Sequence, residues 1–148
     1  MADFDMITDR VATGAALDNA ADVQQILAAG LNVVVDARIE FDDGPLFAGQ
    51  PNVAYLWNPI EDDGLPKPVD YWQRTLSFVL PLLAQPKRKV YLHCAEGVNR
   101  GPSNAFCVLV AQGLAPAVAE GLIRAARPQV GLAYKNDALA ACKLLGYV

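Results

Sequence analysis

The sequence predicts a single α/β domain built on a central, mostly parallel twisted sheet of four or five strands flanked by helices. Short β-branched runs at 33–35, 53–57 and 90–92 have the length and composition of buried parallel strands. Helical patterns lie between these runs, and such alternation is typical of a sheet covered on both faces. The chain has 148 residues, 53% hydrophobic and 19% charged, which favours one domain over residues 1–148.

The first helix is expected to begin after Asp18 or Asn19, because both residue types cap helices by accepting a hydrogen bond from the first-turn amides. It should run to Ala29 and end at Gly30, which tolerates the left-handed conformation that closes many helices. A second helix is expected over 69–84, where large apolar residues recur at helical spacing.

Three further helices are expected in the second half of the chain. Residues 103–112 are apolar nearly all round, which predicts a central buried helix that ends at Gly113. Pro116 suits the first turn of the next helix, which should extend to about Arg127. A last helix carries three core positions: Leu139, Cys142 and Leu145.

The charge balance disfavours several classes of function. The net charge is −4, and the one cationic cluster, 87–89, precedes an apolar strand and is interpreted as a solvated loop, so nucleic-acid binding is not expected. No run of 18 apolar residues occurs, and the acidic N-terminus lacks the order of a secretory signal, so we expect no membrane association.

The cysteines and the single histidine limit the cofactor chemistry. Cys94, Cys107 and Cys142 are odd in number and widely spaced, which indicates a reduced, cytoplasmic protein without a disulfide framework. One histidine and three scattered cysteines do not supply a zinc site, and no Walker-type loop occurs, so no metal or other cofactor is expected. Cys107 and Cys142 fall on helical core positions.

Residues 93–103 are the segment that carries chemistry, with the sequence His-Cys-Ala-Glu-Gly-Val-Asn-Arg-Gly-Pro-Ser. A strand runs into Cys94, a helix begins at or just after Arg100, and Gly97 lies in the turn. This arrangement directs several backbone amides inward at the positive end of a helix, where they suit a tetrahedral dianion. They also favour a thiolate, so we expect Cys94 to be ionised near neutral pH.

The segment His93–Arg100 resembles the HCxxGxxR loop of the protein tyrosine phosphatase superfamily, and the short chain is similar to its dual-specificity branch. Residues 7–14 resemble the opening strand of that branch, 31–38 its second strand, and 59–62 its general-acid loop. The resemblance covers nearly the whole chain, although only the loop is specific. It implies a dual-specificity phosphatase fold over the whole chain.

The resemblance implies a two-step phosphatase mechanism through a phosphocysteine intermediate. Cys94 would attack phosphorus, while Arg100 and the loop amides stabilise the charge that develops on the oxygens. The phosphate-binding residues implied in this way are Ala95, Glu96, Gly97, Val98, Asn99 and Arg100.

An aspartic acid would protonate the leaving oxygen and then activate water. Asp62 is assigned this role because it lies 32 residues before Cys94 and occupies the Pro-Ile-x-Asp position; Asp63 is the rival. His93 is assigned a supporting role in which its hydrogen bonds shape the loop and tune the thiolate. Asp36 and Arg38, at a strand end, are interpreted as a salt bridge or loop cap rather than as cleft residues.

The chain departs from the family at Gly101, where most relatives carry Ser or Thr. That hydroxyl normally assists departure of the sulfur, so its loss predicts slow hydrolysis of phosphocysteine, and Ser103 is expected to point elsewhere. The alternative function is a phosphate-dependent binding module or a regulator with little turnover. A sulfur-transfer or arsenate-reducing enzyme fits less well, because such chains do not usually combine an upstream aspartate loop with the His-Cys pair.

The expected substrate is a phosphorylated protein or a small aryl phosphate. The chain is too short for the loops that deepen the pocket of phosphotyrosine-only enzymes, which favours a shallow cleft accepting phosphotyrosine and phosphoserine or phosphothreonine. Glu96 inside the loop would repel additional phosphates, so a singly phosphorylated partner is favoured. Low charge and acidic loops are compatible with a monomer, which is the expected state.

Overall fold

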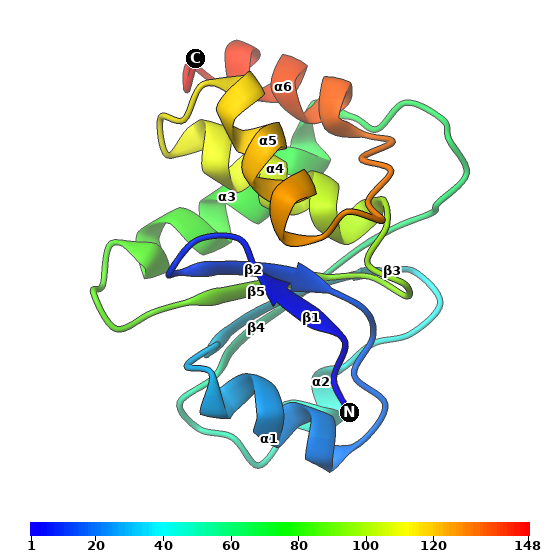
Figure 1. Cartoon of the computed structure of the whole chain (residues 1–148), viewed down its shortest axis with the longest axis vertical. Coiled ribbons are helices and arrows are strands. Elements are labelled where there is room, and N and C mark those ends of the chain that lie inside the picture. The colour runs from blue at the N-terminus through cyan, green and yellow to red at the C-terminus, as the bar shows by residue number, and fades with distance from the viewer.

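The five strands of the computed structural model lie in the order β1-β2-β5-β3-β4, and the model describes residues 1–148 (Figure 1). β1 runs antiparallel to β2, and the other neighbouring strands are parallel. The mostly parallel α/β sheet predicted from the sequence is therefore confirmed. The strands are β1 Phe4–Met6, β2 Val11–Gly14, β3 Val33–Arg38, β4 Ala54–Ile60 and β5 Val90–His93.

Two groups of helices cover the two faces of the sheet (Figure 1). The first group is α1 Ala20–Ala28 and the short α2 Gly44–Phe47. The second group is α3 Val69–Leu83, α4 Arg100–Ala111, α5 Pro116–Ala126 and α6 Lys135–Leu144. Alternate residues of β3 serve the two faces: Val33 and Val35 belong to the larger core cluster, and Val34 belongs to the smaller one.

The register of the central strands gathers several chain segments at one edge of the sheet. In β5, His93 pairs with Gly14 of β2 on one side and with Asp36 of β3 on the other. Ligands of parallel sheets bind beyond the carboxyl ends of the strands. The segment that follows His93 therefore begins at the edge where a ligand site is expected.

The predicted helices agree closely with those observed. Asn19 caps α1, because its side-chain oxygen accepts a 2.9 Å hydrogen bond from the Asp22 amide. Gly30 and Gly113 follow α1 and α4 with φ of +84° and +104°, the conformation expected of glycine beyond a helix end. α4 begins at Arg100, as expected from the segment after Cys94, and it includes three residues before the apolar run at 103–112.

Two expectations about the first half of the chain were wrong in detail. Residues 7–10 do not continue the opening strand; they form the turn of a hairpin between β1 and β2. The Thr8 hydroxyl accepts hydrogen bonds from the amides of Arg10 and Val11, which closes that turn. Pro59 and Ile60, expected in the acid loop, lie at the end of β4. The short α2 was not predicted.

None of the helices has the length and apolar character needed to cross a membrane.

Candidate active site

One cavity of about 310 Å³ opens at the turn between β5 and α4. It brings together Cys94, Arg100 and Asp62, which are the three residues given catalytic roles from the sequence. The full lining is Asp62, Cys94, Ala95, Glu96, Val98, Asn99 and Arg100.

The turn from Cys94 to Arg100 is held from outside through its carbonyl groups. Every carbonyl from Cys94 to Val98 has a hydrogen-bonding partner outside that turn. The partners are His93 Nδ1 at 3.2 Å from Cys94 O, the Ala16 amide on Ala95 O, the Arg127 guanidinium on Glu96 O and Gly97 O, and the Gly131 and Leu132 amides on Val98 O.

The amides of the same turn are left without partners. The six N–H groups from Ala95 to Arg100 donate to no acceptor in the protein. With the carbonyls held outward, these donors surround the cavity at the N-terminus of α4, where the helix dipole adds positive potential. The turn, called the amide cradle below, is therefore suited to bind a tetrahedral anion in front of Cys94.

Gly97 is required by the close approach of this turn to β2. Its φ is +69°, and a Cβ atom there would lie 2.5 Å from the carbonyl carbon of Gly14 and 2.7 Å from Nη2 of Arg127. Gly97 does not line the cavity, since it faces the support behind the turn.

All three cysteines are free. Cys94 is 3% exposed and lines the cavity, whereas Cys107 and Cys142 are fully buried in the core with their sulfurs 3.7 Å apart. The helical core positions expected for these two cysteines are confirmed. A neighbouring thiol therefore faces each of them within the core.

Arg100 lies at the first turn of α4 and is 5% exposed. Its Nη1 donates to Ile60 O at 3.0 Å, and the two Nη atoms donate to the carboxylate of Glu40 at 2.7 and 2.9 Å. Nε is buried without a partner. The contact with Arg100 lowers the pKa of Glu40 to about 2, so Glu40 is an anion at ordinary pH.

Asp62 is held over the cavity by Tyr134, which immediately precedes α6. The Tyr134 hydroxyl accepts from the Gly64 amide at 2.9 Å and donates to Asp62 Oδ1 at 2.8 Å. Asn99 Nδ2 lies 3.5 Å from both oxygens of Asp62, a weak contact. Asp62 Oδ2 therefore remains the less restrained oxygen.

Asp63 is directed away from the cavity. Its carboxylate pairs with Lys67 at 2.6 Å and accepts from the Leu65 amide at 2.9 Å, and it is absent from the cavity lining. The hydrogen bond from Lys67 is the main reason that the pKa of Asp63 is lowered. The two rival aspartates thus have different surroundings, and those of Asp62 suit a proton donor.

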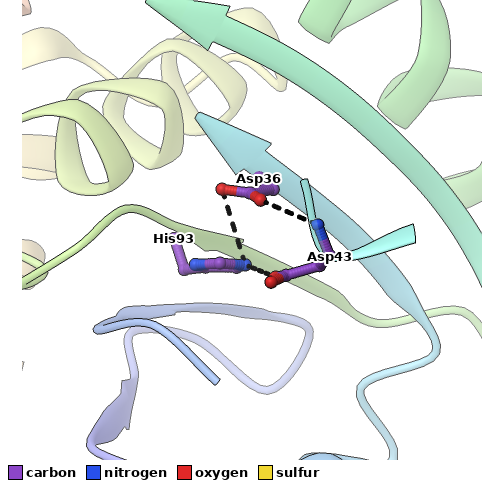
Figure 2. Close-up of side chains that lie close together, drawn as sticks. All are labelled: Asp36, Asp43 and His93. Carbon is purple, nitrogen blue, oxygen red and sulfur yellow. Dashed lines mark hydrogen bonds and ion pairs between the residues drawn. The ribbon is translucent and has the colours of Figure 1, made fainter. Parts of the chain in front are cut away.

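His93 is fully buried behind Cys94 in an ion-pair network, which Figure 2 shows with Asp36 and Asp43. His93 Nε2 lies 2.6 Å from Asp43 Oδ2, and its Nδ1 faces the Cys94 carbonyl. A carbonyl accepts but cannot donate, so Nδ1 carries a hydrogen. Nε2 makes the other contact, with the Asp43 carboxyl group, so both ring nitrogens have partners.

Arg38 completes this network with a positive charge. Its guanidinium contacts Asp36 at 3.2 Å and Asp43 at 2.6 Å. The salt bridge expected between Asp36 and Arg38 is thus observed, and burial raises the pKa of Asp36. Donor atoms of Asp36, Asp43 and His93 lie within 4.8 Å of one another, but Arg38 and backbone amides occupy the carboxylates. We interpret the cluster as an ion-pair network rather than a metal site.

Gly101 lies against the end of β5. A Cβ at this position would be 2.9 Å from Cα of His93 and 3.0 Å from its carbonyl carbon, so helix and strand approach too closely for a side chain. Ser103 accepts from the Tyr134 amide at 3.2 Å and so points toward the segment before α6, as expected. Neither residue supplies a hydroxyl to Cys94.

Four residues that support the site were not predicted as such: Glu40, Asp43, Arg127 and Tyr134. Arg127 is 1% exposed, and besides the turn carbonyls it binds Asp3 and Asp5 of the N-terminal segment at 2.9–3.0 Å. These contacts link residues far apart in the sequence. The only local signal was chemical: a buried arginine or tyrosine requires polar partners.

No protein-family model matches the sequence, and no curated protein matches it. Solved structures do match closely in fold. PTPMT1 in complex with PI(5)P has a TM-score of 0.80 at 16% identity, with 97% of this chain and 96% of that chain covered. Human DUSP28 has a TM-score of 0.79 at 19% identity, with 97% and 95% covered. Tk-PTP in its active form has a TM-score of 0.72 at 20% identity, with 95% and 93% covered. The chain therefore shares a dual-specificity phosphatase-like fold with these solved structures.

Proposed function

We propose that this protein is a cysteine-dependent phosphatase that hydrolyses phosphomonoesters through a phosphocysteine intermediate. The observation that carries the proposal is the amide cradle: the six backbone donors that follow Cys94 have no partner in the protein, and Cys94, Arg100 and Asp62 line the same cavity. Such preorganised donors stabilise charge that spreads over phosphoryl oxygens without any reorganisation during the reaction.

In the first step, the Cys94 thiolate attacks phosphorus in line with the leaving oxygen. The S–P bond forms as the P–O bond to the leaving group breaks, and protonated Asp62 gives its proton to that oxygen. Because Tyr134 holds Oδ1, the proton delivered would come from Oδ2. The cradle amides and the Arg100 guanidinium bind the three non-bridging oxygens of the transferred phosphoryl group.

In the second step, Asp62, now a carboxylate, takes a proton from a water molecule that attacks phosphorus. The P–S bond breaks, inorganic phosphate leaves, and Cys94 returns as a thiolate. His93 supports both steps, since its Nδ1 holds the Cys94 carbonyl out of the cavity.

The proposed substrates are singly phosphorylated groups, namely phosphotyrosine and phosphoserine or phosphothreonine in proteins. Glu96 lines the cavity as an exposed carboxylate with no ion-pair partner. Asp62 and Glu40 add two more carboxylates at or beside the same cavity. A second phosphate near the first would meet this negative rim, which disfavours polyphosphorylated substrates.

Hydrolysis of an aryl phosphate between pH 5 and 7 tests the proposal. We expect Cys94→Ser to abolish turnover and Asp62→Asn to reduce it strongly for substrates with poor leaving groups. Asp63→Asn is the matched control, because it removes the neighbouring carboxylate, which pairs with Lys67 outside the cavity. Activity that survives Cys94→Ser would exclude the mechanism.

A phosphate-dependent binding module with little turnover is the second candidate. It is favoured by the absence of a hydroxyl near Cys94, since position 101 is glycine and Ser103 is engaged with Tyr134. Rapid-quench kinetics separate the two candidates. A stoichiometric burst followed by slow but continuing release of phosphate would support the enzyme, whereas capture of a phosphorylated ligand with no burst and no release of phosphate would support the binding module.

A further inference from the structure

Three large apolar side chains are exposed on one side of the candidate active site. Ile39 and Phe41 belong to the connection between β3 and α2, and Trp57 lies in the edge strand β4. They are 51%, 51% and 40% exposed. Arg38, which directly precedes Ile39, joins the other two: its guanidinium lies 4.8 Å from the centre of the Phe41 ring, and its carbonyl accepts from Trp57 Nε1 at 2.6 Å. The three apolar residues are called the apolar strip below.

Contacts with Arg100 place the apolar strip beside the cavity. Glu40, which stands between the two strip residues of the β3–α2 connection, binds the Arg100 guanidinium in the cavity wall. The carbonyl of Ile60, at the end of β4, accepts from the same guanidinium at 3.0 Å. Both segments that carry the strip therefore reach the cavity wall. An extended peptide advances about 3.4 Å per residue, so side chains a few positions from a group held in the cavity can reach the strip.

The surface around the cavity carries unpaired negative charge. Glu61 directly follows β4 and Glu96 lines the cavity; both are exposed, and neither forms an ion pair. Glu61 thus extends the negative rim described above. The cations that contact these segments are buried and already paired with carboxylates, and their side chains are 8%, 6% and 7% exposed: Arg38, Arg100 and Lys67. The rim is therefore negative toward solvent and attracts a cationic partner.

Exposed apolar residues that gather beside a polar rim mark a surface where a partner binds. A partner that covers the apolar strip and faces the negative rim should carry both apolar and cationic groups. We propose that the substrate is a protein segment in which Lys or Arg and a large apolar residue stand close to the phosphorylated residue. The apolar residue packs on the strip, and the cation faces Glu61 and Glu96.

The inference rests on the proposed function, because the phosphoryl group held in the cavity places the rest of the segment. It adds a preference for the residues that flank the phosphate. An anionic lipid surface fits this face less well than a cationic peptide, since the same rim would repel it.

Hydrolysis of four phosphotyrosine peptides of equal length tests the inference. They combine flanking Lys or Glu with flanking Leu or Ser. We expect kcat/KM to be about tenfold higher with Lys than with Glu at low salt, and the difference to shrink at high salt, because exposed charges are screened. We expect Leu to be preferred over Ser about fivefold at either salt concentration, because apolar burial does not depend on charge.

Two variants separate the contributions of charge and apolar contact. Glu61→Gln should lower the preference for Lys about threefold and leave the preference for Leu unchanged. Ile39→Ser should lower the preference for Leu about twofold or more and leave the preference for Lys unchanged. Hydrolysis of p-nitrophenyl phosphate, which has no flanking residues, serves as the reference for each variant.

α5 offers a matched control for each variant. Glu120→Gln removes a carboxylate that pairs with Arg124 and Lys135, and Val118→Ser removes an apolar side chain that is 50% exposed, close to the 51% of Ile39. Neither control should change a peptide preference.

Equal kcat/KM for the Lys and Glu peptides would overturn the inference, and so would a preference for Leu that is unchanged in Ile39→Ser. Faster hydrolysis of phosphatidic acid in phosphatidylcholine vesicles than of the best peptide would overturn it in favour of a lipid substrate. If p-nitrophenyl phosphate is hydrolysed but the four peptides do not differ, the inference fails and the phosphatase proposal stands. If the wild type hydrolyses no phosphomonoester, the phosphatase proposal fails, and calorimetric binding of the same four peptides decides the inference by the same ranking.

Discussion

Tyr134 donates a 2.8 Å hydrogen bond to Asp62 across 72 residues of sequence, and the same hydroxyl accepts from the Gly64 amide. The accepted bond orients the hydroxyl hydrogen toward Asp62 Oδ1. The loop after β4 is thereby attached to the segment before α6, and the carboxyl group is fixed over the cavity.

Tyr134→Phe is expected to reduce kcat about tenfold for alkyl phosphates, which need a proton on the leaving oxygen, and less for p-nitrophenyl phosphate. The reason is the loss of an oriented Asp62, a geometric contribution of the size usual for one hydrogen bond to a charged group. Steady-state kinetics on both substrates measure the difference. Tyr147→Phe, near the exposed C-terminus, is the control. An equal loss on both substrates would show that Tyr134 acts on something other than proton delivery.

Asp43→Asn is expected to slow alkylation of Cys94 by iodoacetamide several-fold. The substitution replaces the carboxyl group that lies 2.6 Å from His93 Nε2, so the ring whose Nδ1 holds the Cys94 carbonyl loses its other partner and the turn around the sulfur is less well fixed. Mass spectrometry of the Cys94 peptide follows the reaction. Asp9→Asn, in the β1–β2 turn, is the control. Unchanged reactivity in Asp43→Asn would mean that the contact between Asp43 and His93 does not support the turn.

Gly101→Ser is expected to hydrolyse phosphocysteine faster than Gly101→Ala does. Both variants add a Cβ at 2.9 Å from His93 Cα, so both should lose stability, by about 1–3 kcal/mol, from overpacking. They differ only in the hydroxyl, which makes Ala the control for the steric effect. Single-turnover kinetics report the second step. Equal rates in the two variants would show that a hydroxyl at this position does not assist the leaving sulfur.

Glu40→Gln is expected to lose less free energy of unfolding than the wild type when the pH is lowered from 6 to 2.5. The folded-state pKa of Glu40 is about 2, below its ordinary value of 4.5, so its contact with Arg100 stabilises the fold above about pH 4.5 and is lost as the pH falls toward 2. Since the side chain is half exposed, solvent screening limits this contribution to about 1 kcal/mol. Urea denaturation at pH 6 and pH 2.5 measures it. An identical change with pH in the variant and the wild type would contradict the assignment.

The part of the site that is continuous in sequence was the part that could be predicted. Cys94, Gly97 and Arg100 lie in one short turn between a strand and a helix, so local rules place them together. Asp62, which lies 32 residues before Cys94, was assigned as the proton donor from the family resemblance. Its place in the cavity lining, from which Asp63 is absent, favours it over Asp63 for that role.

The supporting residues could not be predicted, because each comes from a different element. Glu40 reaches Arg100 from the β3–α2 connection, and Tyr134 reaches Asp62 from the segment before α6. Neither contact leaves a periodic pattern, since it depends on how two distant segments pack. The opening strand was misplaced for a related reason: Thr8 closes a turn through side-chain hydrogen bonds that the alternation of apolar residues does not reveal.

The bonds from Arg127 to Asp3 and Asp5 have a practical meaning for handling the protein. Loss of the first few residues by proteolysis would leave an almost fully buried guanidinium without its counterions, although those residues never touch the cavity. The same guanidinium holds the carbonyls of Glu96 and Gly97. A preparation with a ragged amino terminus would therefore contain molecules with different affinities for the same anion.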